Sequence, residues 1–97
     1  MNTEQVKVKQ GHCITNEQLK ISMGRANKCV QELVSRGFKV LLINEYLHFP
    51  RIVVANSVLC SELDGRPKVR KKIHGVYMRQ MAAFFMDCQV EWTEIGH

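Results

Sequence analysis

Apolar residues recur at helical spacing in the first part of the chain. The repeat has intervals of four, three, four and three positions and comprises Leu19, Met23, Ala26, Val30 and Leu33. Such spacing is typical of the buried stripe of an amphipathic helix. Thr15 and Gln18 have the spacing of a capping box, and Gly37 can supply a left-handed residue after the last turn. The sequence therefore predicts a helix over residues 16–36.

Two segments after this helix have the composition of β-strands. Residues 38–46 and 51–56 contain apolar runs with β-branched and aromatic residues, and a connection of hairpin length joins them. We expect these two segments to form an antiparallel pair. Residues 88–95 predict a further strand.

The segment from Ile73 to Met86 fits two periodicities. Some of its apolar residues follow helical spacing, whereas others alternate along one face of a strand. Because Met, Gln and Ala are good helix formers, we favour a helix over residues 76–86 and keep a strand as the alternative. The fold expected is α+β, one long amphipathic helix packed on a small antiparallel sheet, in the order α-β-β-loop-(α or β)-β. Residues 1–97 form one small domain, with residues 1–12 as a flexible tail.

Composition supports a globular chain in a reducing compartment. The 97 residues are 45% hydrophobic and 24% charged, which is close to the globular average. No apolar run approaches the roughly 20 residues of a membrane span. The N-terminal residues lack the apolar segment of a secretory signal, so we expect a cytoplasmic protein with reduced thiols and no contact with a membrane.

The residues that usually carry metal or covalent chemistry are scattered. Four cysteines lie far apart and form no C-x-x-C pair: Cys13, Cys29, Cys60 and Cys88. We expect them to be buried thiols, with no metal site and no cofactor. Four histidines are equally dispersed and no glycine-rich phosphate loop is present. The sequence therefore predicts a protein that is not an enzyme.

Positive charge is concentrated in one short run. Lys and Arg outnumber Asp and Glu by 14 to 9. Five of these cations fall within seven residues that follow the turn signal Asp64-Gly65: Arg66, Lys68, Arg70, Lys71 and Lys72. We expect an exposed basic loop over residues 64–74 that contacts an acidic protein surface, a phosphate backbone, or only solvent. Tyr77 and Trp92 are the aromatic candidates for a secondary contact outside the core.

Three fragments together carry a resemblance to a known group of proteins. They are residues 32–40, residues 50–54 followed by Cys60, and residues 88–92. The chain resembles small proteins encoded by phages and prophages of enterobacteria. This resemblance implies a non-enzymatic protein that binds a host protein complex, such as a nuclease or a CRISPR surveillance complex, and inhibits or redirects it. The alternative is a small nucleic-acid-binding protein that uses the basic run. A homodimer is a further expectation if residues 76–86 bury a second apolar side.

Overall fold

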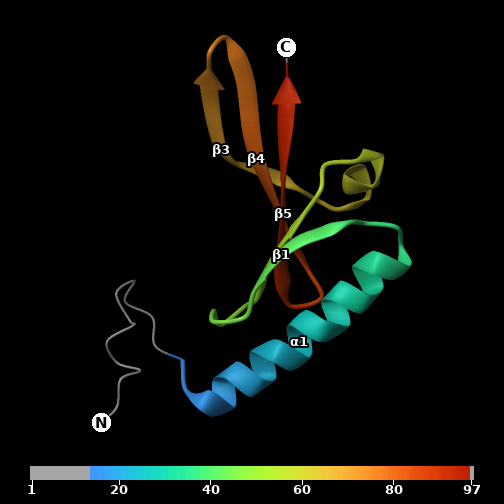
Figure 1. Cartoon of the computed structure of the whole chain (residues 1–97), viewed down its shortest axis with the longest axis vertical. Helices are drawn as coiled ribbons and strands as arrows, with labels where there is room; N and C mark the ends of the chain where they lie inside the picture. The colour runs from blue at the N-terminus through green and yellow to red at the C-terminus, as the bar shows by residue number, and fades with distance from the viewer. Residues whose placement is uncertain (1–13, 97) are drawn as a thin grey trace.

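The described part of the chain, residues 14–96 of a computed structural model, consists of one long helix against one face of a five-stranded sheet (Figure 1). The elements in chain order are α1 (Asn16–Ser35), β1 (Val40–Asn44), β2 (Arg51–Val54), the 3-10 helix η2 (Val58–Glu62), β3 (Arg66–Ile73), β4 (Val76–Phe85) and β5 (Cys88–Gly96). The α+β class and the single long helix are thus confirmed. The tail over residues 1–12 lies outside the described residues. No helix within residues 14–96 is both long and apolar enough to span a membrane.

The predicted ends of α1 are confirmed. The Thr15 hydroxyl accepts a hydrogen bond from the Gln18 backbone N–H at 3.1 Å, and the Gln18 side chain accepts from the Thr15 N–H at 2.8 Å. This capping box satisfies N–H groups that have no partner inside the helix. After the helix, Gly37 has a φ of 98°, which glycine adopts without the steric cost of a Cβ.

The buried face of α1 differs slightly from the predicted stripe. Ser22, Ala26, Cys29 and Leu33 are buried, whereas Met23 is 46% exposed, so the burial expected for Met23 is wrong. The reason is a rotation of the helix that places Ser22 toward the sheet. Its hydroxyl lies 2.6 Å from the carbonyl oxygen of Glu45 and 3.1 Å from that of Leu47. The buried serine therefore fixes α1 to the connection between β1 and β2.

The sheet has the order β1-β2-β5-β4-β3, so β5 lies at its centre. The predicted antiparallel pair of β1 and β2 is confirmed, with Ile43 opposite Ile52. β4 pairs with β3 and β5 in antiparallel fashion. β2 and β5 pair in parallel, with Ile52 opposite Val90, so the sheet is mostly rather than wholly antiparallel.

The helix favoured over residues 76–86 is wrong, because this segment is the strand β4. Two-residue turns connect β4 to β3 and to β5, and all four turn residues have positive φ: His74 and Gly75 at 52° and 81°, Met86 and Asp87 at 51° and 62°. Positive φ at both positions is the geometry of type I′ turns, which match the twist of paired strands. Pairing on both sides satisfies the β4 backbone and overrides the helix propensity of its residues.

The basic loop expected over residues 64–74 is also wrong as a loop, because most of it is the edge strand β3. This strand pairs with β4 from Arg66 opposite Ala82 to Ile73 opposite Val76, with an irregularity after Pro67. An edge strand accommodates dense charge because its side chains and one row of backbone groups face solvent. The cations are therefore held by a sheet rather than by a mobile segment.

The core lies between the sheet, α1 and η2. It includes the buried residues Leu33, Ile52, Val90 and Trp92. The exposure expected for Trp92 is wrong: its side chain is only 2% exposed. The connection before β3 crosses the indole ring so closely that a Cβ added to Gly65 would lie 2.4 Å from it. The position of β5 at the centre of the sheet explains this burial.

Candidate functional site

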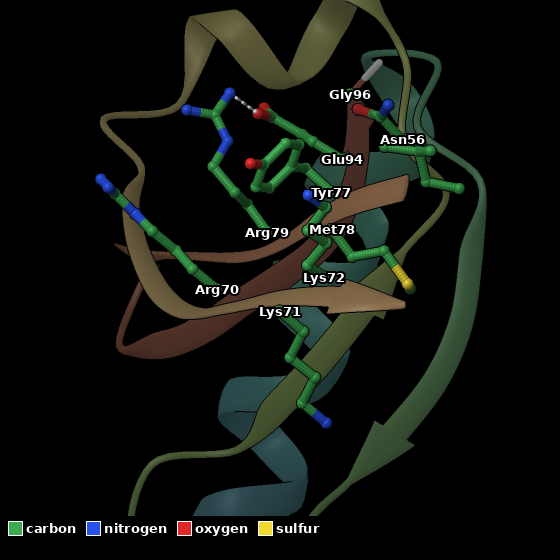
Figure 2. A pocket seen from close by; sticks show the side chains of 10 residues that line it. Asn56, Arg70, Lys71, Lys72, Tyr77, Met78, Arg79, Glu94 and Gly96 are labelled. Carbon is green, nitrogen blue, oxygen red and sulfur yellow. Dashed lines mark hydrogen bonds and ion pairs between the residues drawn. The ribbon is translucent and has the colours of Figure 1, made fainter. Parts of the chain in front are cut away.

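The hairpin of β3 and β4 carries the predicted basic residues on both of its faces. Cross-strand partners share a face, and Ala83 places the odd-numbered residues of β4 on the face that α1 covers. Arg70 and Lys72 lie opposite Arg79 and Tyr77 and so share that face. Lys71 lies opposite Met78 on the other face. Figure 2 shows this arrangement, with Lys71 directed away from Arg79.

Beyond the end of the core, the hairpin and the end of β5 border a shallow hollow of about 770 Å³ (Figure 2). Within it the Nζ atom of Lys72 lies 5.0 Å from the centre of the Tyr77 ring, a cation–π distance. Arg79 donates to Glu94 at 2.7 Å. Tyr77 is 55% exposed and so lies outside the core, as predicted. The hollow is lined by Asn56, Arg70, Lys71, Lys72, Tyr77, Met78, Arg79, Glu94, Ile95 and Gly96. It is therefore cationic, with one exposed aromatic ring.

Four of the five predicted basic residues form no ion pair among residues 14–96. The ion pairs in that range involve Arg36, Arg51, Lys68 and Arg79. Arg66, Arg70, Lys71 and Lys72 are exposed and make none of these pairs. Their charges therefore remain available to an anionic partner.

Lys68 has a different role from its four basic neighbours. It lies in the irregular part of β3 between Pro67 and Val69, and its ammonium group donates to Oε2 of Glu91 at 3.1 Å. The structure therefore divides the predicted group into four outward cations and one cation that is bound within the fold.

Glu91 is the residue that sequence reasoning missed. It lies on the central strand β5 and is 0% exposed. Oε1 accepts hydrogen bonds from Arg51 Nε and Gln80 Nε2, both at 2.9 Å. Oε2 accepts from Lys68 and from Gln89. The only signal in the sequence is the alternation of polar residues with Val90 and Trp92 along this strand.

The electrostatic environment keeps Glu91 ionised. Burial raises the pKa of this carboxyl, but the hydrogen bonds from Gln89, Arg51 and Lys68 outweigh burial and hold the pKa below its usual value. A carboxylate with a lowered pKa and four donors is a poor proton acceptor and a poor nucleophile. Its arrangement joins β2, β3, β4 and β5 on the face opposite α1.

The described cysteines are buried, as predicted: Cys29, Cys60 and Cys88. Burial, with the neighbouring thiol of Cys88, raises the pKa of Cys29 to about 12. Because the thiolate is the reactive form, this environment makes Cys29 a poor nucleophile. Within residues 14–96, no group of three or more His, Cys, Asp or Glu residues is arranged to hold a metal ion. Cys13 lies outside the described residues.

No protein-family model, no curated protein and no solved structure matches this chain.

Proposed function

We propose that this chain is a non-enzymatic binding protein of phage type, which covers an acidic surface of a host protein complex and thereby blocks or redirects that complex. The observation that carries this proposal is the row of four outward cations on β3: Arg66, Arg70, Lys71 and Lys72. These cations lie on an edge strand, outside the core, and form no ion pair within the described chain. An acidic partner would pair with them and would be steered toward them from a distance.

The sign of the charge restricts the mode of binding. The formal net charge is +5, so imitation of DNA, which requires an acidic surface, is disfavoured. Cations on both faces of one strand suit a hairpin that inserts along an acidic patch or groove. The resemblance to small phage proteins supports a protein complex of the host as the partner that carries this patch.

The chemistry of the buried groups supports a binding role rather than catalysis. Both oxygens of Glu91 are occupied by donors from its own chain. Cys29 and Cys88 are fully buried, and the pKa of each thiol is raised, mainly by burial. Catalysis by a covalent intermediate requires an accessible nucleophile beside a base. These buried groups do not supply one.

A second candidate function rests on Tyr77. Its exposed ring lies beside Lys72 and in the same hollow as Arg70 and Arg79. A ring on which a base can stack, surrounded by cations that can meet phosphates, is the arrangement by which proteins bind single-stranded nucleic acid. Single-stranded RNA or DNA is therefore the alternative partner.

The experiment that separates the two partners uses variants at side chains that form no ion pair among residues 14–96. Arg70→Ala/Lys71→Ala removes two outward charges, and Lys20→Ala/Lys28→Ala removes two exposed charges from α1 as the matched control. The tagged protein is used to capture partners from host lysate with and without nuclease, and the captured protein is then purified for binding kinetics. We expect capture to survive nuclease, and the hairpin variant to bind with an association rate about tenfold lower, while the control changes little.

Other outcomes decide against the protein partner. Nucleic acid is the partner if capture is lost after nuclease and the hairpin variant shows a flatter salt dependence. For single strands, the slope of log affinity against log salt should flatten by about 1.4, because each of the two lost phosphate contacts contributes about 0.7. In that case Tyr77→Ala should also weaken binding, by about 1–3 kcal/mol per stacked base. Equal binding by both double variants would contradict any role for the basic hairpin.

A further inference from the structure

The two edges of the sheet have opposite chemical character. β3, at one edge, contains Pro67 and five cations, which are features that prevent edge-to-edge association. β1, at the other edge, has the sequence Val-Leu-Leu-Ile-Asn and contains neither proline nor charge. Like β3, it has one irregularity of register, between Val40 and Leu42, but Leu42, Ile43 and Asn44 pair regularly with β2. One row of its backbone groups faces away from β2, as in any edge strand. The described chain therefore protects one edge and leaves the other suited to pairing.

The side chains of β1 are apolar and exposed on both faces of the sheet. Leu42 lies opposite Val53, and Ile43 lies opposite Ile52, so the two residues point to opposite faces. Leu41, Leu42 and Ile43 are 56%, 51% and 42% exposed. A run of three exposed apolar residues is unusual for an edge strand in contact with water. A second strand beside β1 would cover side chains on both faces at once.

The sequence around β1 is complementary to itself. In an antiparallel pair of two β1 strands centred on Leu42, Leu41 of one copy lies opposite Ile43 of the other. In the same register Lys39 lies opposite Glu45, and the two-fold symmetry makes this pair twice. Neither Lys39 nor Glu45 belongs to an ion pair among the described residues. Opposite charges at directly paired positions stabilise an antiparallel register.

We propose that β1 is a homodimer interface, at which two copies of this chain pair their β1 strands in antiparallel fashion to form one continuous sheet. A second copy is the occupant that the charges favour, because Lys39 and Glu45 supply both signs in the spacing that self-pairing needs. The symmetry also places the two basic β3 strands at the outer ends of the sheet, where repulsion between them is smallest. This interface is independent of the proposed function, since it uses the opposite edge of the sheet.

The first test measures the oligomeric state of the purified full chain by light scattering and sedimentation equilibrium over a wide concentration range. We expect a dimer that dissociates on dilution. Leu42→Lys places a charge in the centre of the interface and should yield a monomer, whereas Val58→Lys, at an 88% exposed apolar residue of η2, should leave the dimer intact. Circular dichroism of each variant verifies that the fold is kept. A monomeric wild-type protein, or a dimer indifferent to Leu42→Lys, would overturn the proposal.

The second test examines the register itself. Each single variant, Lys39→Glu or Glu45→Lys, places two like charges opposite each other at both symmetry-related positions of the dimer. Each should raise the dissociation constant of the dimer on the order of tenfold. The double variant Lys39→Glu/Glu45→Lys restores both pairs with reversed signs and should recover the affinity. Failure of the double variant to recover, in a protein of normal circular dichroism, would refute the proposed register.

Discussion

Replacing Glu91 with glutamine tests the buried charge network at nearly constant side-chain volume. The change removes a negative charge that accepts from Arg51 at 2.9 Å and from Lys68 at 3.1 Å. It also introduces an amide NH₂ group beside the donating amides of Gln80 and Gln89, so at least one buried donor is left without an acceptor. We therefore expect a clear loss of stability without a change of fold.

The magnitude follows from the exposure of the two cations. A hydrogen bond to a charged group contributes about 1.5–3 kcal/mol when buried. The Arg51 and Lys68 side chains are 31% and 44% exposed, so water solvates them once they are freed, and about 1 kcal/mol each is a reasonable loss. The unsatisfied amide adds about 1–2 kcal/mol. The total of about 3–4 kcal/mol should lower the Tm by more than about 10 °C in a chain of this length.

The effect should depend on pH in a defined direction. The pKa of Glu91 is lower in the folded than in the unfolded chain, so the unfolded state binds the proton more readily. Its contribution to stability is fully present above the ordinary glutamate pKa of about 4.3 and is lost as the pH falls through the lowered folded value. The difference in unfolding free energy between wild type and Glu91→Gln should therefore be large at pH 7 and shrink below about pH 4.

Denaturant unfolding at a series of pH values, followed by circular dichroism, measures this difference. Glu62→Gln is the matched control, because Glu62 is exposed and belongs to no ion pair among the described residues, and it should change stability by less than about 0.5 kcal/mol. A Glu91→Gln variant as stable as wild type, or a loss that stays constant from pH 7 to acid, would refute the reasoning.

Two further predictions concern the packing of the core. Gly65→Ala would place a Cβ 2.4 Å from the Trp92 ring and should destabilise the fold by about 1–3 kcal/mol. Gly24→Ala adds a Cβ in open space in mid-helix and should stabilise the fold by about 0.5–1 kcal/mol. Thermal unfolding of both variants measures the contrast, and equal shifts in Tm would show that the connection at Gly65 does not press on the indole ring. The thiols of Cys29 and Cys88 should resist iodoacetamide at pH 8 in the native protein and react fully in denaturant, with the modified residues identified by mass spectrometry; alkylation of either thiol in the native protein at the denatured rate would contradict their burial.

The sequence predicted local elements more successfully than the arrangement of strands. The capping box at Thr15 and Gln18 and the glycine at position 37 are local signals, and α1 begins and ends where they indicate. The turn at Met86 and Asp87 has no such signal, because neither residue is glycine although both have positive φ. Without a recognisable turn before β5, the apolar residues of β4 fit a helix as well as a strand, and only pairing with two distant segments decides between them.

The candidate site was predicted in composition but not in geometry. The charges of Arg70, Lys71 and Lys72 are evident in the sequence, and the structure shows them exposed. The ion pair between Lys68 and Glu91 requires β5 to lie at the centre of the sheet. β5 is central because it pairs with β2 in parallel as well as with β4. The parallel pairing joins segments about 40 residues apart and leaves no short-range pattern to detect.

The parallel pairing of β2 with β5 also governs how the chain reaches this fold. It joins two halves that are each built from neighbouring segments, α1-β1-β2 and the meander β3-β4-β5. We expect local contacts within each half to form early, because the junction must close a loop that runs from Arg51 to Gln89. Before closure, the carboxylate of Glu91 has partners only from its own half: Lys68, Gln80 and Gln89.

Arg51 is the single donor to Glu91 that the first half contributes, and it arrives only when β2 docks. If β2 docked one residue out of register, the side chain of Ile52 instead of Arg51 would turn toward the carboxylate, and Arg51 would turn into the core. An apolar group beside a buried carboxylate and a guanidinium among apolar residues are both costly. We therefore expect the Arg51–Glu91 pair to favour the correct alignment of β2, because only in that alignment does the guanidinium of Arg51 reach the carboxylate of Glu91.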